Sequence, residues 1–161
     1  MSLYAAEVLE RETTVAGVLR TTCVALTNAL RADACNLSRV IGQLLVDLVA
    51  HSRDGRKIML GRSYLLPDYP VTQEAVETME SRSVWLLDPA VDPSEAALLR
   101  ELDFDALLML PFMLDGRVWG LLEVYRSGDR AFDDGDVELA QQIATDAANV
   151  IERLQRHAAA A

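Results

Sequence analysis

The pattern of apolar and polar positions is clearest between residues 106 and 154, which predict a β-hairpin followed by one long helix. Two apolar runs flank Asp115-Gly116, a dipeptide that adopts the two positive φ angles of a tight type I′ turn with little strain. Asp133 then supplies an N-cap oxygen and Asp136 a carboxylate in the first turn, so a helix is expected to begin here. Its apolar positions recur at alternating steps of three and four and form a seam suited to another helix: Val137, Ala140, Ala144, Ala147, Ile151 and Leu154.

The N-terminal part of the chain predicts a helix and two strands. Apolar positions form one face of a helix over residues 4–31, with a break near residues 12–14. Two apolar-rich runs of strand length, 34–41 and 43–50, are separated by Gly42, which indicates antiparallel strands joined by a tight turn or bulge. In the second strand a period of two places four residues on one face: Leu45, Asp47, Val49 and His51.

The middle of the chain alternates short elements with polar connections. Residues 63–66 and 83–87 predict short extended segments. Thr72 is the expected N-cap of a short helix, and Pro93 stands at the first position of another helix through Leu102. Strands and helices mix without βαβ alternation, which favours an α+β fold with a central antiparallel β-sheet of about five to six strands and helices on its faces.

Composition limits the classes of function. With 161 residues and 51% hydrophobic content the chain is long enough for one domain with its own core, expected over residues 4–157. We expect residues 1–3 to be a cloning leader and residues 158–161 a disordered tail. The net charge of −10 argues against nucleic acid and anionic membranes as partners, because both attract a basic surface. No apolar run approaches the roughly 20 residues that span a bilayer, and no signal peptide is found, so a cytoplasmic location is expected.

Motifs for catalysis and metal binding are missing from the sequence. It contains no Gly-rich phosphate loop, HExxH motif or nucleophile elbow, and its two histidines offer few metal ligands. The spacing of the two cysteines, Cys23 and Cys35, fits neither a zinc cluster nor CxxC redox chemistry, which favours small buried core residues. The sequence therefore predicts no catalytic residue and no metal site.

The run PFMLDGRVWGLLEVYRSGDRAFDDGDVELAQQIATDAANVIERL resembles the C-terminal half of bacterial sensory GAF domains. It has a proline-opened strand, a tight turn, a strand carrying Gly-Leu-Leu-Glu, an aromatic residue and an Ala-rich closing helix. Earlier in the chain, LRADACNLSRV resembles that family's first strand. The resemblance implies terminal helices packed together on one face of the sheet. On the other face it implies a small-molecule pocket covered by residues 58–105.

The resemblance leaves the ligand and any cofactor unknown. Cyclic-nucleotide-binding members carry Asn-Lys, then Phe, then Asp-Glu, whereas here Tyr125-Arg126 stands roughly where Asn-Lys would be and Val137 follows Asp136. Bilin-binding members need a cysteine near a histidine in the pocket region, but no cysteine follows Cys35. The expected pocket has five candidate ligand-binding residues: Tyr64, Trp85, Asp88, Phe104 and Glu123.

Among these candidates, Glu123 stands out because a carboxylate inside a strand is costly when it is buried without a partner. A structural hydrogen bond is the alternative explanation, since the family commonly carries Glu at this position of its motif.

The leading hypothesis is a non-catalytic sensory or regulatory module that binds an unidentified small molecule and signals through its terminal helices. The apolar seam predicts a homodimer through helices 8–30 and 134–157, and an effector domain in a longer parent chain fits the same hypothesis. Two alternatives stay open. One is an enzyme similar to free methionine sulfoxide reductase, with Cys35 as nucleophile and Cys23 as resolving thiol; the other is a dimerisation module without a ligand.

Overall fold

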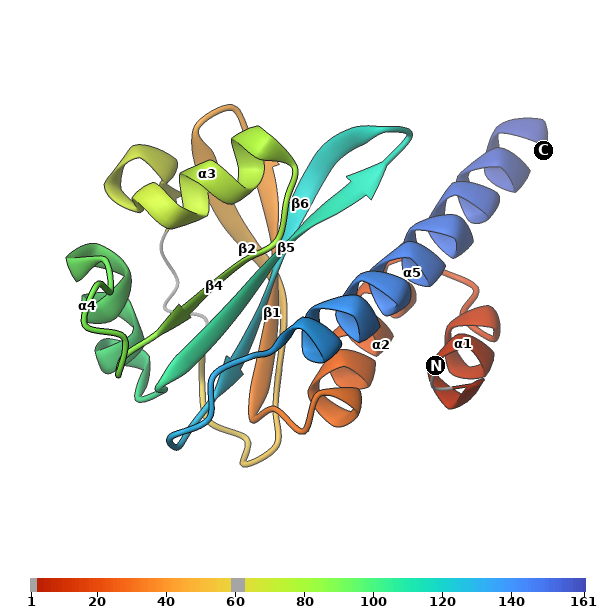
Figure 1. Ribbon diagram of the computed structural model, residues 1–161. Helices are drawn as coiled ribbons and strands as arrows, with labels where there is room; N and C mark the ends of the chain where they lie inside the picture. Colours follow the sequence, from red (N-terminus) through yellow and green to blue (C-terminus); the bar gives the residue numbers. More distant parts are fainter. Residues whose placement is uncertain (1–2, 59–62) are drawn as a thin grey trace.

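In the computed structural model, which describes residues 3–58 and 63–161, one antiparallel β-sheet lies between two layers of helices (Figure 1). Its strands, in the spatial order β3-β2-β1-β6-β5-β4, are β1 (Ala34–Ile41), β2 (Leu44–Ser52), β3 (Tyr64–Leu65), β4 (Arg82–Trp85), β5 (Ala106–Leu114) and β6 (Arg117–Arg126). The helices are α1 (Leu3–Glu10), α2 (Val15–Ala29), α3 (Pro70–Thr78), α4 (Pro93–Leu102) and α5 (Asp134–Ala160), with a short 3-10 helix η1 (Leu66–Asp68). The predicted α+β fold is confirmed.

The two helical layers bury the two faces of the sheet in separate cores. Helices α1, α2 and α5 cover one face, where Leu26, Phe112 and Ile151 are fully buried together (Figure 1). Helices α3 and α4 cover the other face, over a smaller core that includes Leu99 and Leu121. This is the arrangement that the family resemblance implied.

Local capping signals set the N-terminal helix boundaries. The region predicted as one helix with a break is divided into α1 and α2, and Thr14 caps α2 by accepting a hydrogen bond from Gly17 N at 3.0 Å. The predicted short helix in the middle of the chain starts earlier than expected. Pro70 occupies its first turn, because a fixed φ suits that position, so Thr72 lies inside α3 and is not its N-cap.

The ends of the chain also differ from expectation. Helix α1 already includes Leu3, while Met1 and Ser2 of the predicted leader lie outside the described residues. Helix α5 continues through Ala160, so residues 158–160 are helical where a disordered tail was predicted. A run of alanines has the highest helix propensity, which accounts for the extension.

The hairpin and its following helix form as their sequence predicts. Asp115 and Gly116 both have positive φ, 49° and 72°, as a type I′ turn requires. Asp133 and Asp136 make a reciprocal capping box at the start of α5, at 2.9 and 3.1 Å. The hairpin tip also contacts the far part of α5, because Asp115 N donates a hydrogen bond to Glu152 Oε1 at 2.8 Å.

A β-bulge in β2 changes which of its residues share a face. The pairing with β1 passes from Leu37–Val49 to Ser38–Asp47, which leaves Leu48 as the extra residue. Asp47 therefore shares the α3 side of the sheet with Leu45, whereas Val49 packs into the core under the terminal helices. The predicted common face for these residues is wrong beyond the bulge, because one inserted residue reverses the alternation.

Candidate functional site

A narrow cavity lies between the sheet and the layer of α3 and α4. Strands β1, β2 and β6 provide its floor with Asn36, Leu45, Glu123 and Tyr125. The covering segments complete the lining with Ile58, Tyr64, Tyr69, Thr72, Leu98 and Leu102. The cavity leaves only about 20 Å³ for the centre of a water-sized molecule, which is room for about one such group.

Polar side chains on neighbouring strands meet around Asn36, which lines the cavity floor. Asn36 Nδ2 donates hydrogen bonds to Asp47 Oδ1 at 2.9 Å and to Ser38 Oγ at 3.2 Å. The Ser38 hydroxyl donates to the same Asp47 oxygen at 2.8 Å. Asn36 Oδ1 and Asp47 Oδ2 are buried with no hydrogen-bond partner among the described residues. The described part of the chain therefore leaves one acceptor oxygen unsatisfied on a residue of the floor, Asn36, and one on its neighbour Asp47.

Glu123 stands directly opposite Asn36 in the pairing of β6 with β1, and only 7% of its surface is exposed. Burial raises the pKa of its carboxyl from 4.5 to about 8. The hydroxyl of Tyr125, which donates to Glu123 Oε2 at 2.9 Å, opposes this rise, while the negative charges of Asp47 and Glu95 add to it. The Glu123 carboxyl is therefore mostly protonated at neutral pH.

A second buried acid joins the two helices that cover the cavity. Glu95, in the first turn of α4, is 1% exposed and accepts hydrogen bonds from Thr72 N at 2.9 Å and from the Thr72 hydroxyl at 2.6 Å. Burial raises the pKa of Glu95, and these two bonds lower it. Its second oxygen, Oε2, is buried without a described partner. Glu95 thus satisfies a free N–H at the start of α3 and holds α3 against α4.

The structure brings together three of the five predicted ligand-binding residues. Tyr64 and Glu123 line the cavity. Phe104 is buried next to it and stacks on the ring of Tyr125, with ring centroids 5.1 Å apart. A ligand contact by any of these three stays a prediction.

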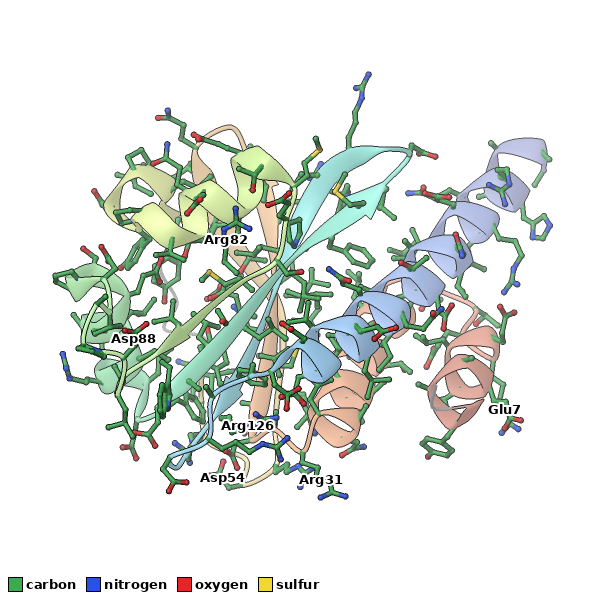
Figure 2. The ribbon with its side chains drawn as sticks, in the orientation of Figure 1. Glu7, Arg31, Asp54, Arg82, Asp88 and Arg126 are labelled. Atoms are coloured by element: carbon green, nitrogen blue, oxygen red, sulfur yellow. The ribbon has the colours of Figure 1, made fainter. Side chains whose placement is uncertain are left out.

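The other two predicted residues lie elsewhere. Trp85 packs against the core under the terminal helices, because its neighbour Val84 faces the cavity side and successive strand residues alternate. Asp88 is exposed beside α4, where its side chain accepts a hydrogen bond from Ala90 N at 2.8 Å (Figure 2). The structure brings neither of them to the cavity.

Sequence reasoning missed Asn36 and Glu95, which carry much of the polar character of the site. Asn36 lies inside an apolar-rich strand, where a polar residue at an alternate position was a usable signal. Glu95 follows Asp92-Pro93 in a helix start, so its carboxylate was indistinguishable from an ordinary first-turn acid.

The two cysteines lie on the other side of the sheet from the cavity. Cys23 of α2 and Cys35 of β1 are free, fully buried and part of the core under the terminal helices. Burial and the neighbouring Cys23 raise the pKa of the Cys35 thiol well above its ordinary value. Because the thiolate is the reactive form, this position opposes the thiol-enzyme alternative.

Within residues 3–58 and 63–161, no group of three or more His, Cys, Asp and Glu side chains could hold a metal ion. In the same part of the chain, no helix combines the length and the apolar character that crossing a membrane requires.

Together, the six-stranded antiparallel sheet, its paired terminal helices and the covered cavity define a three-layer α+β domain. The family model for the GAF domain matches residues 12–152, and the chain belongs to the GAF domain family. No curated protein sequence matches the chain.

Solved structures with the same fold include three signalling or chromophore-binding proteins. The chromophore-binding domain of the bacteriophytochrome RpBphP3 from R. palustris is 13% identical, with a TM-score of 0.78 over 96% of this chain and 61% of that one. Residues 122 to 287 of a methyl-accepting chemotaxis protein are 19% identical, with a TM-score of 0.72 over 93% and 96% of the two chains. The cyanobacteriochrome TePixJ GAF domain is 16% identical, with a TM-score of 0.74 over 91% and 94%. The present chain spans less than two thirds of the bacteriophytochrome structure, and at these identities the likeness concerns the fold.

Proposed function

We propose that this GAF domain is a non-catalytic sensory module that binds a small molecule in the cavity under α3 and α4. The observation that carries this proposal is the unsatisfied buried acceptor Asn36 Oδ1 on a residue that lines the cavity, with a second unsatisfied acceptor, Asp47 Oδ2, on its hydrogen-bond partner. Buried polar atoms in native proteins almost always have a partner, so a ligand or an ordered water is expected at this place. The cavity as described admits only a small group, so we propose that a larger ligand enters by moving α3 and α4 away from the sheet.

The path from the cavity to the terminal helices runs through strand β6. Glu123 and Tyr125 line the cavity, and the next residue, Arg126, is held by the elements on the other side (Figure 2). The Arg126 guanidinium donates to Leu30 O at 2.6 Å and to Asp136 Oδ2 at 3.2 Å. A ligand that shifts β6 therefore acts on the end of α2 and the start of α5. The shift requires that the ligand bind the two helix arrangements with different affinity.

Native mass spectrometry of the purified protein tests ligand binding. We expect an additional small-molecule mass on the folded chain that is lost when the protein is denatured. A chain that carries no such mass, and gains none after incubation with a metabolite extract, would contradict the proposal and favour the ligand-free dimerisation module.

A homodimer is the second part of the proposal, and we place its interface beside α5 and not on the predicted seam. The apolar seam of α5 is used within the protomer: Ala140, Ala147 and Ile151 are fully buried against the core. An open groove of about 430 Å³ lies beside α5 instead, between this helix and strand β5. Its helical wall consists largely of small and polar residues: Gln141, Ala144, Thr145, Ala148, Asn149 and Glu152. Small side chains permit close approach of a second helix, which supports this face as the dimer interface.

Sedimentation velocity of two matched variants tests the dimer. Thr145 is exposed and lines the groove, whereas the exposed Gln142 does not. We expect the wild-type protein and Gln142→Arg to sediment as dimers, and Thr145→Arg to sediment as a monomer because its long charged side chain obstructs the groove. A wild-type monomer, or a Thr145→Arg dimer of unchanged stability, would refute this interface.

A cytoplasmic location and output through an effector domain in a longer parent chain belong to the same proposal. The acidic composition and the chemotaxis-protein relative support them.

A further inference from the structure

We infer that the cavity takes a small protonated amine, whose ammonium group binds between Glu123 and the amide oxygen of Asn36. This inference rests on the proposed small-molecule function and names the ligand class for the same cavity. Its first support is the unsatisfied acceptor Asn36 Oδ1, which belongs to a residue that is only 4% exposed and lines the cavity. Such an oxygen needs a donor, and an ammonium group offers three N–H donors and no acceptor.

The charge of the surroundings also selects a cation. Two further buried or partly buried acids, Asp47 of β2 and Glu95 of α4, lie close enough for their charges to act on Glu123. Each has one oxygen without a partner in the described part of the chain. No Lys or Arg is among the described residues that line the cavity. An anionic ligand would lie close to the carboxyl groups of Glu123 and its acidic neighbours, which is unfavourable in a buried site.

The lining favours a small organic cation over a bare ion, and its carbon chain enters with the movement of α3 and α4 that the proposed function requires. Leu45, Leu98 and Leu102 supply apolar surface. Tyr64 and Tyr69 add two aromatic rings in an edge-to-face arrangement, with centroids 5.8 Å apart. Aromatic faces attract cations, and apolar walls cover a short carbon chain. A quaternary ammonium has no N–H donor and would leave Asn36 Oδ1 unsatisfied, so amines that carry an N–H donor are selected.

Binding involves the release of one proton. The neutral Glu123 carboxyl loses its proton to the solvent as the ammonium ion enters, and the resulting carboxylate pairs with that ion. The groups that face Glu123 in this step are Asp47, Glu95, Tyr125 and Tyr64. Apparent affinity therefore rises with pH between about 6 and 8, as long as the amine itself stays protonated.

A titration with three probes of similar size tests the charge that the cavity prefers. Ethanolammonium is cationic, ethylene glycol is neutral and glycolate is anionic, and backbone amide shifts in NMR spectra report where each one binds. We expect ethanolammonium to shift residues 36, 47 and 123, and ethylene glycol and glycolate to leave them unchanged. Glu123→Gln should weaken ethanolammonium binding by at least about tenfold, because a charge-assisted hydrogen bond becomes a neutral one. The control Asp88→Asn, which also removes one acidic residue but outside the cavity, should bind like the wild type.

Several outcomes would overturn the inference. Equal or tighter binding of glycolate or ethylene glycol in the cavity excludes an amine site, yet leaves the small-molecule function intact. If Glu123→Gln binds ethanolammonium as tightly as the wild type does, the Glu123 carboxylate is not part of the binding site. No response to ethanolammonium also overturns the inference. In that case the proposed small-molecule function stands if mass spectrometry finds a co-purified molecule that is not an amine. If no co-purified molecule is found, the proposed function fails together with the inference.

Discussion

We expect the stability of the wild-type protein to decrease as pH rises from about 5 to about 8. In the Glu123→Gln variant most of this decrease should be absent. Burial raises the pKa of Glu123 from 4.5 to about 8 in the folded protein. In this range the native state keeps a proton that the unfolded chain releases, so unfolding becomes more favourable with each step upward in pH. Below about pH 4.5 the group contributes no difference between the two states.

The expected size of this effect makes it measurable. The shift in the pKa of Glu123 corresponds to at most about 5 kcal/mol of unfolding free energy across the whole range. Glutamine resembles the neutral carboxyl in shape and cannot ionise, so its variant should show a much flatter profile. Some pH dependence of stability remains in the variant, because burial also raises the pKa of Glu95. That raised pKa makes the protein less stable at higher pH in the same way. Urea unfolding at several pH values between 5 and 8 gives both profiles.

A glutamate-to-glutamine change on the surface provides the control. Glu77 of α3 is exposed and accepts a hydrogen bond from Gln73 at 2.8 Å, which a glutamine can also accept. Glu77→Gln should keep the wild-type pH dependence. Parallel profiles for the wild type and Glu123→Gln would show that Glu123 is ionised in the native protein, against the environment described above.

Replacing Arg126 with Ala should destabilise the domain by about 3–5 kcal/mol, the usual result of removing one partner from a buried ion pair. Arg126 is 5% exposed, and its partner Asp136 has a side chain that is only 12% exposed. The variant would also leave the carbonyl oxygens of Leu30 and Ala131 without this donor and remove the cation from the face of Phe132, 4.0 Å away. Chemical denaturation monitored by circular dichroism measures the loss.

A nearby surface arginine separates this effect from a simple change of charge. Arg130 pairs with Asp133 at 3.5 Å, and both side chains are more than half exposed. Arg130→Ala should therefore change the stability by less than about 1 kcal/mol. If Arg126→Ala were equally mild, Arg126 would not hold β6, α2 and α5 together, and the proposed route from the cavity to α5 would lose its central residue.

The elements of this fold that the sequence predicts well are those whose signals are local. Asp115-Gly116 determines the hairpin, and Asp133 with Asp136 determines the start of α5, since each depends on a few neighbouring residues. The side of the sheet on which a residue lies is harder to predict. One extra residue, Leu48, turns Val49 away from Asp47, and a simple alternation contains no sign of it.

The cavity was only partly predictable for a different reason. Glu123 was identified because a carboxylate inside a strand is unusual on its own. Its surroundings depend on strand order, which brings Asn36 of β1 beside a residue 87 positions later in the chain. The contact between Thr72 and Glu95 likewise joins two helices that are separate in sequence. Such pairings follow from tertiary packing, and no single segment encodes them.

Two polar contacts between the β5–β6 hairpin and α5 restrict how this helix can move. The strand end is fixed to the start of α5 by Arg126 and Asp136, and the hairpin tip is fixed further along by Asp115 and Glu152. Sliding along the axis by one helical turn, about 5.4 Å, would break both contacts at once. Tilting about the buried Arg126 contact breaks only the exposed one. Under the proposed signalling function, a tilt of α5 about the Arg126 contact would displace the C-terminal part of this helix most, because that part lies furthest from the contact (Figure 1).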